Sequence, residues 1–175
     1  YKSVPLLCLG SLAERTSRPD GTFTLSLDTE LAWGRFDTEP VEERAEQFRA
    51  TPGVVTDLCT LCDRYDVPAT WALVAHLLVD CRDTARHGHP DQTPPAYDWV
   101  DDWFRAAPCT RGLNDAIWYW PDVVSTLQSA TASHDIGLPG YTHVILGAAG
   151  CSRSAASHAL DRACDVRRAA SVAPV

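Results

Sequence analysis

The sequence predicts an α/β fold in which helices pack against a parallel β-sheet. Segments with the two-residue period of strands alternate with segments at helical spacing, in the order β, α, β, α, β, α. Such alternation is typical of right-handed crossovers between parallel strands, which form either an open sheet or a closed barrel. With 175 residues, 45% of them hydrophobic, the chain is long enough for one domain with its own core.

The first strand is expected at Thr22–Asp28, where apolar side chains alternate with serine and threonine. Pro40–Ala50 then has the charge and the spacing of an amphipathic helix. The pair Pro52-Gly53 is expected to end that helix before a second one begins at Val54–Tyr65. Two helices are therefore predicted between the first and second strands.

Two of the seven cysteines, Cys59 and Cys62, fall on the apolar positions of the second helix. A single Cys-x-x-Cys pair is a weak signal for zinc or redox chemistry, so we interpret them as buried thiols. Free thiols favour a reducing, cytoplasmic compartment. The sequence lacks an initiator Met, and an upstream export signal stays open as an alternative.

The second strand is expected at Val67–Val74, which is apolar throughout and suits a strand covered on both faces. Asp80–Ala96 is rich in glycine and proline and is predicted to be a surface excursion. His87 and His89 lie in it; they are interpreted as solvated, with metal binding as the alternative.

Helices are expected at Asp98–Ala107 and Pro121–Ala132. A short strand at His134–Leu138 and a final helix at Ser152–Ala170 are expected to follow them. The apolar face of that last helix is predicted from the spacing of Ala156, Leu160, Ala163 and Cys164. The expected organisation is an extension at 1–21, one domain at 22–170 and a tail at 171–175.

The formal net charge of −8 opposes binding to a phosphate backbone, so nucleic acid is not an expected partner. No apolar run approaches the length needed to cross a bilayer. Neutral or cationic sugars are compatible with this charge. The tryptophans that invite a sugar-stacking interpretation are expected to be core residues instead: Trp33, Trp71, Trp118 and Trp120.

Two carboxylates, Asp28 and Glu30, close the first strand. Side chains two apart in a strand project from the same face, so these two are expected to converge at the carboxyl end of a parallel strand. One carboxylate there can hold a metal ion while the other takes a proton from water. The alternative is a solvated strand end.

His143 follows the third strand through a Gly/Pro turn. A neutral imidazole at a strand exit is a suitable donor for zinc or cobalt. A structural loop histidine is the alternative. The spacing thus points to a candidate site made of carboxylates from the first strand and an imidazole from the third.

Three segments resemble the polysaccharide deacetylases that share the NodB homology domain: Thr22–Glu30, Val67–Trp71 and His134–His143. Ile117–Val124 is also similar to the stretch before the histidine motif in one branch of that family, and the resemblance covers roughly residues 20–168. It implies a distorted (β/α) barrel and a metal-dependent hydrolase that removes acetyl groups from a carbohydrate or another N-acetylated substrate.

By the same resemblance, Asp28 is the catalytic base, and Glu30 and His143 are ligands of a divalent metal, zinc in the first instance. The sequence departs from the family pattern at Pro139, which stands where a second histidine ligand is expected. Leu138 and Gly140 replace its polar neighbours. His134 is weighed as a substitute but is expected at the start of its strand.

The later motifs of the family find no match before Val175, so the barrel is expected to be incomplete at its C-terminus. Three alternatives to an active sugar deacetylase therefore remain open. They are a non-catalytic carbohydrate-binding domain, a degenerate or truncated deacetylase domain, and an amide hydrolase of small molecules.

Overall fold

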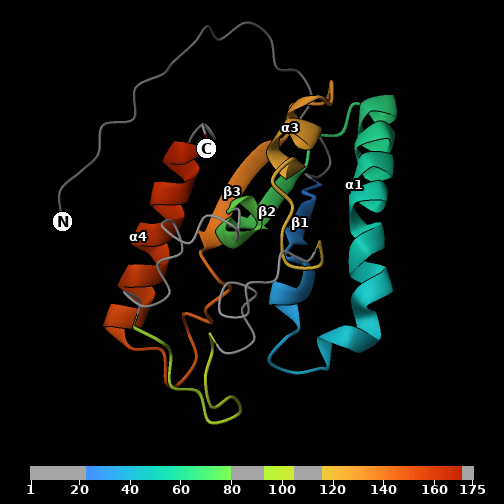
Figure 1. The fold of residues 1–175 in the computed structure, drawn as a ribbon. Coiled ribbons are helices and arrows are strands. Elements are labelled where there is room, and N and C mark those ends of the chain that lie inside the picture. Colours follow the sequence, from blue (N-terminus) through green and yellow to red (C-terminus); the bar gives the residue numbers. More distant parts are fainter. Residues whose placement is uncertain (1–22, 80–92, 105–115, 171–175) are drawn as a thin grey trace, which may run out of the picture.

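The computed structural model describes residues 23–79, 93–104 and 116–170. Its strands and helices, drawn in Figure 1, are β1 (Ser26–Thr29), η1 (Leu31–Gly34), η2 (Val41–Arg44), α1 (Ala45–Tyr65), β2 (Thr70–Val74), η3 (Ala75–Leu78), α3 (Val123–Gln128), β3 (Asp135–Gly140) and α4 (Arg153–Ala169). The expected extension 1–21, the tail 171–175, and His87 and His89 lie outside the described residues.

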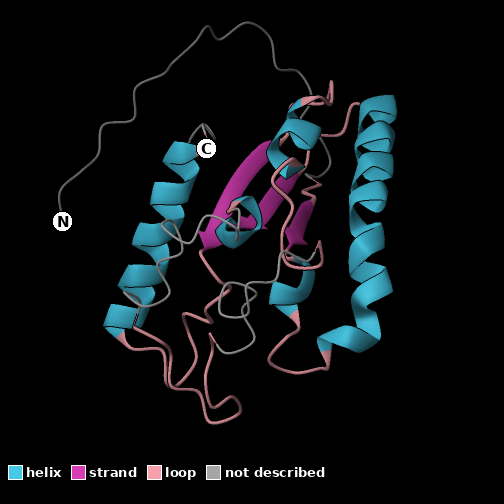
Figure 2. Cartoon of the chain, viewed as in Figure 1, coloured by secondary structure: helices cyan, strands magenta, loops and turns pink. Residues whose placement is uncertain are grey.

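The three strands form one parallel sheet in the order β1-β2-β3. Figure 2 shows the sheet between the long helices α1 and α4. Asp28 of β1 is in register with Ala72 of β2, which is in register with Gly137 of β3. Because the strands are parallel, all three end at one edge of the sheet, which we call the carboxyl edge.

The expected distorted (β/α) barrel is wrong: the described residues form an open sheet of three strands, with β1 and β3 at its two sides. A (β/α) barrel closes because about eight tilted strands bring the first beside the last. Three strands cannot return on themselves. The local prediction of alternating, parallel strands is nevertheless confirmed. β1 and β2 begin four and three residues later than expected, and β1 and β3 end one and two residues later.

The predicted break at Pro52-Gly53 is also wrong, because α1 is one helix with Pro52 inside it. A proline removes its own N–H bond and bends a helix, but packing can hold the helix together across it. Here Val55, Cys59 and Cys62 lie on the buried face about one, two and three turns later. The hydroxyl of Thr56 donates to the Pro52 carbonyl at 3.0 Å.

Cys59 and Cys62 are free and buried, which confirms their interpretation as core thiols. Burial raises the pKa of Cys59, and the nearby Cys62 and Asp63 act in the same direction. A thiol with a raised pKa stays protonated and is a poor nucleophile and metal ligand. Cys59 packs in the core with residues of the sheet, and Cys62 is buried on α1.

Three helix predictions change at the level of detail. The described part of Asp98–Ala107 forms turns instead of a helix, and α3 is shorter than Pro121–Ala132. Helix α4 begins after Ser152, whose side chain accepts a hydrogen bond from the Ala155 N–H at 3.1 Å and caps the helix. Its buried residues are Ala155, Ala159, Ala163 and Val166, whereas Leu160 and Cys164 of the predicted face are exposed.

The main core lies between α1, α3 and the sheet and is rich in tryptophan. Trp33, Trp71, Trp118 and Trp120 are all buried, as expected for core residues. Trp33 packs edge-on against Trp118, with ring centroids 5.0 Å apart. None of the helices in the described ranges is long and apolar enough to cross a membrane.

Candidate functional site at the carboxyl edge

Three titratable side chains follow the three strands at the carboxyl edge. Glu30 comes directly after β1, His76 lies in η3 directly after β2, and His143 follows β3. Parallel strands place such positions side by side, although they are far apart in the sequence. The carboxyl edge is therefore where this fold gathers groups able to do chemistry.

Glu30 and His143 are in direct contact: Oε1 of Glu30 lies 2.7 Å from Nε2 of His143. Their side chains are partly exposed, 20% and 34% respectively. A carboxylate and an imidazole at this distance form a hydrogen bond that becomes an ion pair when the histidine is protonated. The side chains predicted from the first and third strands are thus brought together.

The backbone on both sides of this contact is unusual. Leu31, next to Glu30, has a φ of 50°, and His143 itself has a φ of 57°. The left-handed region costs a residue with a β-carbon about 1–2 kcal/mol, so the surrounding contacts must hold it there. Such strain is frequent at functional sites and gives the pair a fixed geometry.

The segment that leads into His143 is anchored from both sides. The Tyr141 carbonyl accepts a hydrogen bond from the His76 N–H at 2.9 Å. The Thr142 carbonyl accepts one from Nε1 of Trp103 at 3.1 Å. Tyr141 and Thr142 are fully buried. These contacts explain how the chain can enter His143 in a strained conformation.

On the Glu30 side of the contact, η1 holds the backbone next to Glu30 in place. The Ala32 N–H donates to the Ile117 carbonyl at 2.9 Å, which ties η1 to the segment before α3. Gly34 leaves room for the Glu30 carboxylate: a β-carbon there would overlap Oε2 of Glu30. Glycine at this position is therefore a requirement of the Glu30 side-chain conformation.

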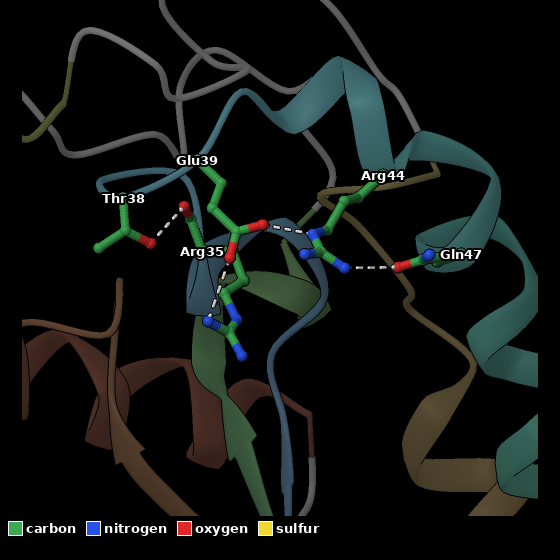
Figure 3. Close-up of polar contacts among 5 residues, drawn as sticks. All are labelled: Arg35, Thr38, Glu39, Arg44 and Gln47. Carbon is green, nitrogen blue, oxygen red and sulfur yellow. Dashed lines mark hydrogen bonds and ion pairs between the residues drawn. The ribbon is translucent and has the colours of Figure 1, made fainter.

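Beyond η1, surface contacts order the connection to α1, as Figure 3 shows. Arg35 pairs with Glu39 at 3.2 Å, and Glu39 also pairs with Arg44. Arg44 in turn donates to the side-chain oxygen of Gln47 at 3.1 Å. Exposed pairs of this kind contribute about 0–1 kcal/mol each, so their effect is mainly on the path of the chain.

The hydrogen bond with Glu30 raises the pKa of His143 above its ordinary value. Partial burial of the imidazole opposes this effect, and the negative charges of Glu30, Asp37 and Asp28 add to it. His143 is therefore protonated to a higher pH than a free histidine. Asp28 lies near enough to act on the imidazole through its charge.

An open hollow of about 320 Å³ adjoins the acidic side of the site, between β1, η1 and α1. Its polar lining includes Asp28, Glu30 and Arg35, and its apolar lining comes mainly from α1 and β1. Sites of this kind, mostly apolar with a few polar groups, are typical of small-ligand binding.

The residues predicted from the sequence lie at both ends of the sheet. Asp28 is the penultimate residue of β1 and is exposed, and Glu30 and His143 meet at the carboxyl edge. His134 lies before β3, where its Nδ1 accepts a hydrogen bond from the Ala69 N–H at 3.1 Å. That is the opposite end of the sheet, so His134 does not supply the missing donor. Pro139 lies within β3, which tolerates it as an edge strand.

The donor set does not fit a catalytic zinc site. A carboxylate and an imidazole are donors that zinc accepts, but catalytic sites normally have three protein ligands. Within the described ranges, no three or more His, Cys, Asp or Glu side chains are grouped so that they could hold a metal ion. Glu30 and His143 provide two donors, and Pro139 provides none.

Several residues near this edge are not indicated by the sequence patterns. His76 is fully buried, with its ring 4.7 Å from that of Trp33. Its position directly after an apolar strand was a usable signal. Asp37 and Trp99 hydrogen-bond to each other at 3.0 Å. Trp99 falls in Asp98–Ala107, which was expected to be a helix, and Asp37 lies in a turn that no sequence pattern indicates.

No protein-family model, curated protein or solved structure matches this chain.

Proposed function

We propose that this chain binds carbohydrate at the carboxyl edge of its sheet, as a deacetylase-like domain whose Glu30–His143 pair contacts the sugar without a catalytic metal. The single observation that carries the proposal is the 2.7 Å contact between these two side chains, in strained and anchored segments. The resemblance to polysaccharide deacetylases supplies the substrate class. Free buried thiols support a reducing compartment, which we propose to be the cytoplasm.

The chemistry of the pair suits a sugar that carries hydroxyl and acetamido groups. When His143 is protonated, Nε2 donates to Glu30 and Nδ1 is a second donor, able to bind an acetamido or hydroxyl oxygen. The carboxylates of Glu30 and Asp28 accept hydrogen bonds from hydroxyl groups. Both donors and acceptors are therefore present within one small region.

Calorimetric titration with the β-1,4-linked trisaccharide of N-acetylglucosamine, in buffer containing a chelator, tests this proposal. The wild-type chain is expected to bind saturably, and Glu30→Gln to bind about tenfold more weakly, because a charge-assisted hydrogen bond is lost. Glu43→Gln, a change of the same kind on exposed η2, is the control and should bind like the wild type. Equal affinity of all three proteins, or no binding at all, would refute the proposal.

Metal-dependent removal of acetyl groups is the second candidate. The observation that favours it is that Asp28 and Glu30 line the same hollow, and the charge of Asp28 also acts to raise the pKa of His143. It requires a third metal donor from outside the described residues. Release of acetate from the same trisaccharide with added zinc, abolished in Asp28→Asn, would favour this function; absence of acetate would favour binding alone.

A further inference from the structure

Trp99 presents a flat ring to solvent beside the candidate site. It is 49% exposed, although large aromatic side chains are usually buried. One face of the indole lies on Tyr97, with ring centroids 4.6 Å apart and an angle of 9° between the planes. Since that face is covered, the exposed area belongs to the opposite face and the ring edge.

Both stacked rings are held in place. Nε1 of Trp99 donates to Oδ2 of Asp37 at 3.0 Å. Tyr97 is only 4% exposed; its hydroxyl accepts from the Ile145 N–H at 2.8 Å and donates to the Ile145 carbonyl at 3.1 Å. Burial raises the pKa of Tyr97 to about 12, so the hydroxyl keeps its proton. A ring fixed in this way loses little side-chain entropy when a ligand binds.

These rings are linked to the segment that carries His143. Asp37, which positions Trp99, lies close enough to His143 for its charge to raise the pKa of the imidazole. Ile145, which Tyr97 binds, is two residues beyond His143. Trp103, in edge contact with Tyr97 at 5.1 Å, also binds the carbonyl of Thr142. One set of contacts therefore fixes both the histidine and the exposed indole.

We propose that the open face of Trp99 stacks on a pyranose ring of a bound glycan, while the Asp37 carboxylate accepts a hydrogen bond from a hydroxyl of the same sugar. The C–H face of a pyranose is apolar and weakly positive at its hydrogens, which matches the negative face of an indole. Trp99 uses one oxygen of Asp37, and the carboxylate has a second one for the sugar.

The surroundings of Trp99 favour a sugar over an apolar protein partner. Asp98 and Asp101, its neighbours in the sequence, are exposed and charged. Protein interfaces are depleted of such charges at their core, whereas a single aromatic ring among polar groups suits a ligand that has one apolar face and many hydroxyls. The proposal rests on the carbohydrate-binding function and names a subsite within it.

The test measures affinity for the trisaccharide of N-acetylglucosamine in Trp99→Ala, Trp99→Phe and Tyr65→Ala. Tyr65 is a matched control, because it is also an exposed aromatic residue but lies at the end of α1. Trp99→Ala is expected to bind about tenfold more weakly than the wild type. Trp99→Phe, which keeps a ring but loses the bond to Asp37, should fall between them, and Tyr65→Ala should equal the wild type.

The outcomes separate this proposal from the function on which it rests. Weak binding by Trp99→Ala together with normal binding by Glu30→Gln supports the subsite and contradicts the role of the pair. Normal binding by Trp99→Ala together with weak binding by Glu30→Gln overturns the subsite alone. Equal losses in Trp99→Ala and Tyr65→Ala would also overturn it. If Trp99→Ala melts at a lower temperature than the wild type, the affinities of Trp99→Phe and Tyr65→Ala are compared instead. Weaker binding by Trp99→Phe supports the subsite, and equal binding overturns it.

Discussion

The carboxylate of Glu30 occupies the space in which a β-carbon on Gly34 would stand. Gly34→Ala should therefore push the carboxylate away from His143. The obstructing atom is the end of a flexible side chain, and alanine is favoured over glycine in helical backbone, so the fold should keep its stability. We expect weaker sugar binding with an unchanged melting temperature, measured by calorimetry and circular dichroism. Full affinity in this variant would show that Glu30 does not need its position beside Gly34.

The stability of the chain should depend on pH through His143. The pKa of His143 is about 6.5 in the unfolded chain and is raised above that value in the folded state. The stabilisation from the pair is therefore fully present below about pH 6.5 and is lost as the pH rises through the raised pKa. Melting temperatures of the wild type and Glu30→Gln, compared from pH 5.5 upward, should converge as the pH rises. A difference that is constant over this range would contradict the prediction.

Gly150→Ala should destabilise the fold. Gly150 has a φ of 93°, and a β-carbon there would overlap the backbone carbonyl of Ala96. The N–H of Ala96 also donates a hydrogen bond to the Gly150 carbonyl at 2.9 Å. We expect a loss of about 1–3 kcal/mol and a melting temperature lower by roughly 2–4 °C for each kcal/mol. Gly147→Ala is the control, since a β-carbon at Gly147 meets no atom within 4 Å. Equal melting temperatures of the two variants would be inconsistent with this account.

Pro139→His should improve zinc binding. Glu30 and His143 supply two donors, and position 139 lies in β3 near the same edge of the sheet. A third donor there is expected to tighten zinc binding at least about tenfold over the wild type, measured by calorimetry. Pro68→His, at an exposed proline before β2, is the control and should not gain affinity. Equal zinc affinity of both variants would exclude position 139 as a metal ligand.

Local patterns in the sequence predicted much of this fold. Alternation in the first strand and the apolar run of the second located β1 and β2, because strand periodicity reflects burial directly, although both strands begin three or four residues later than the pattern indicates. Local patterns failed where long-range packing decides. Pro52 does not break α1, because Val55 and Cys59 are held against the sheet. In α4, alanines occur on both faces, so spacing alone could not identify Ala155 and Ala159 as the buried set.

The candidate site was predictable in part. Topology alone brings residues after β1 and β3 to one edge, and so Glu30 and His143 were expected to meet. The expectation that Asp28 and Glu30 project from the same face of the strand was wrong. Glu30 lies outside the strand, with a ψ of −22°, and does not follow strand alternation from Asp28. The pairing of Asp37 with Trp99 depends on irregular segments. The expected helix at Asp98–Ala107 is not formed in its described part, because periodicity does not encode the conformation of turns.

The most direct measurement is the NMR titration of His143 in the wild-type chain and in Glu30→Gln, with Glu43→Gln as the control. If the carboxylate of Glu30 binds the imidazole, the pKa of His143 should lie above its ordinary value in the wild type and in Glu43→Gln, and should fall clearly in Glu30→Gln. Identical titration curves for His143 in all three proteins would show that the pair does not form, and the proposed site would then lose its basis.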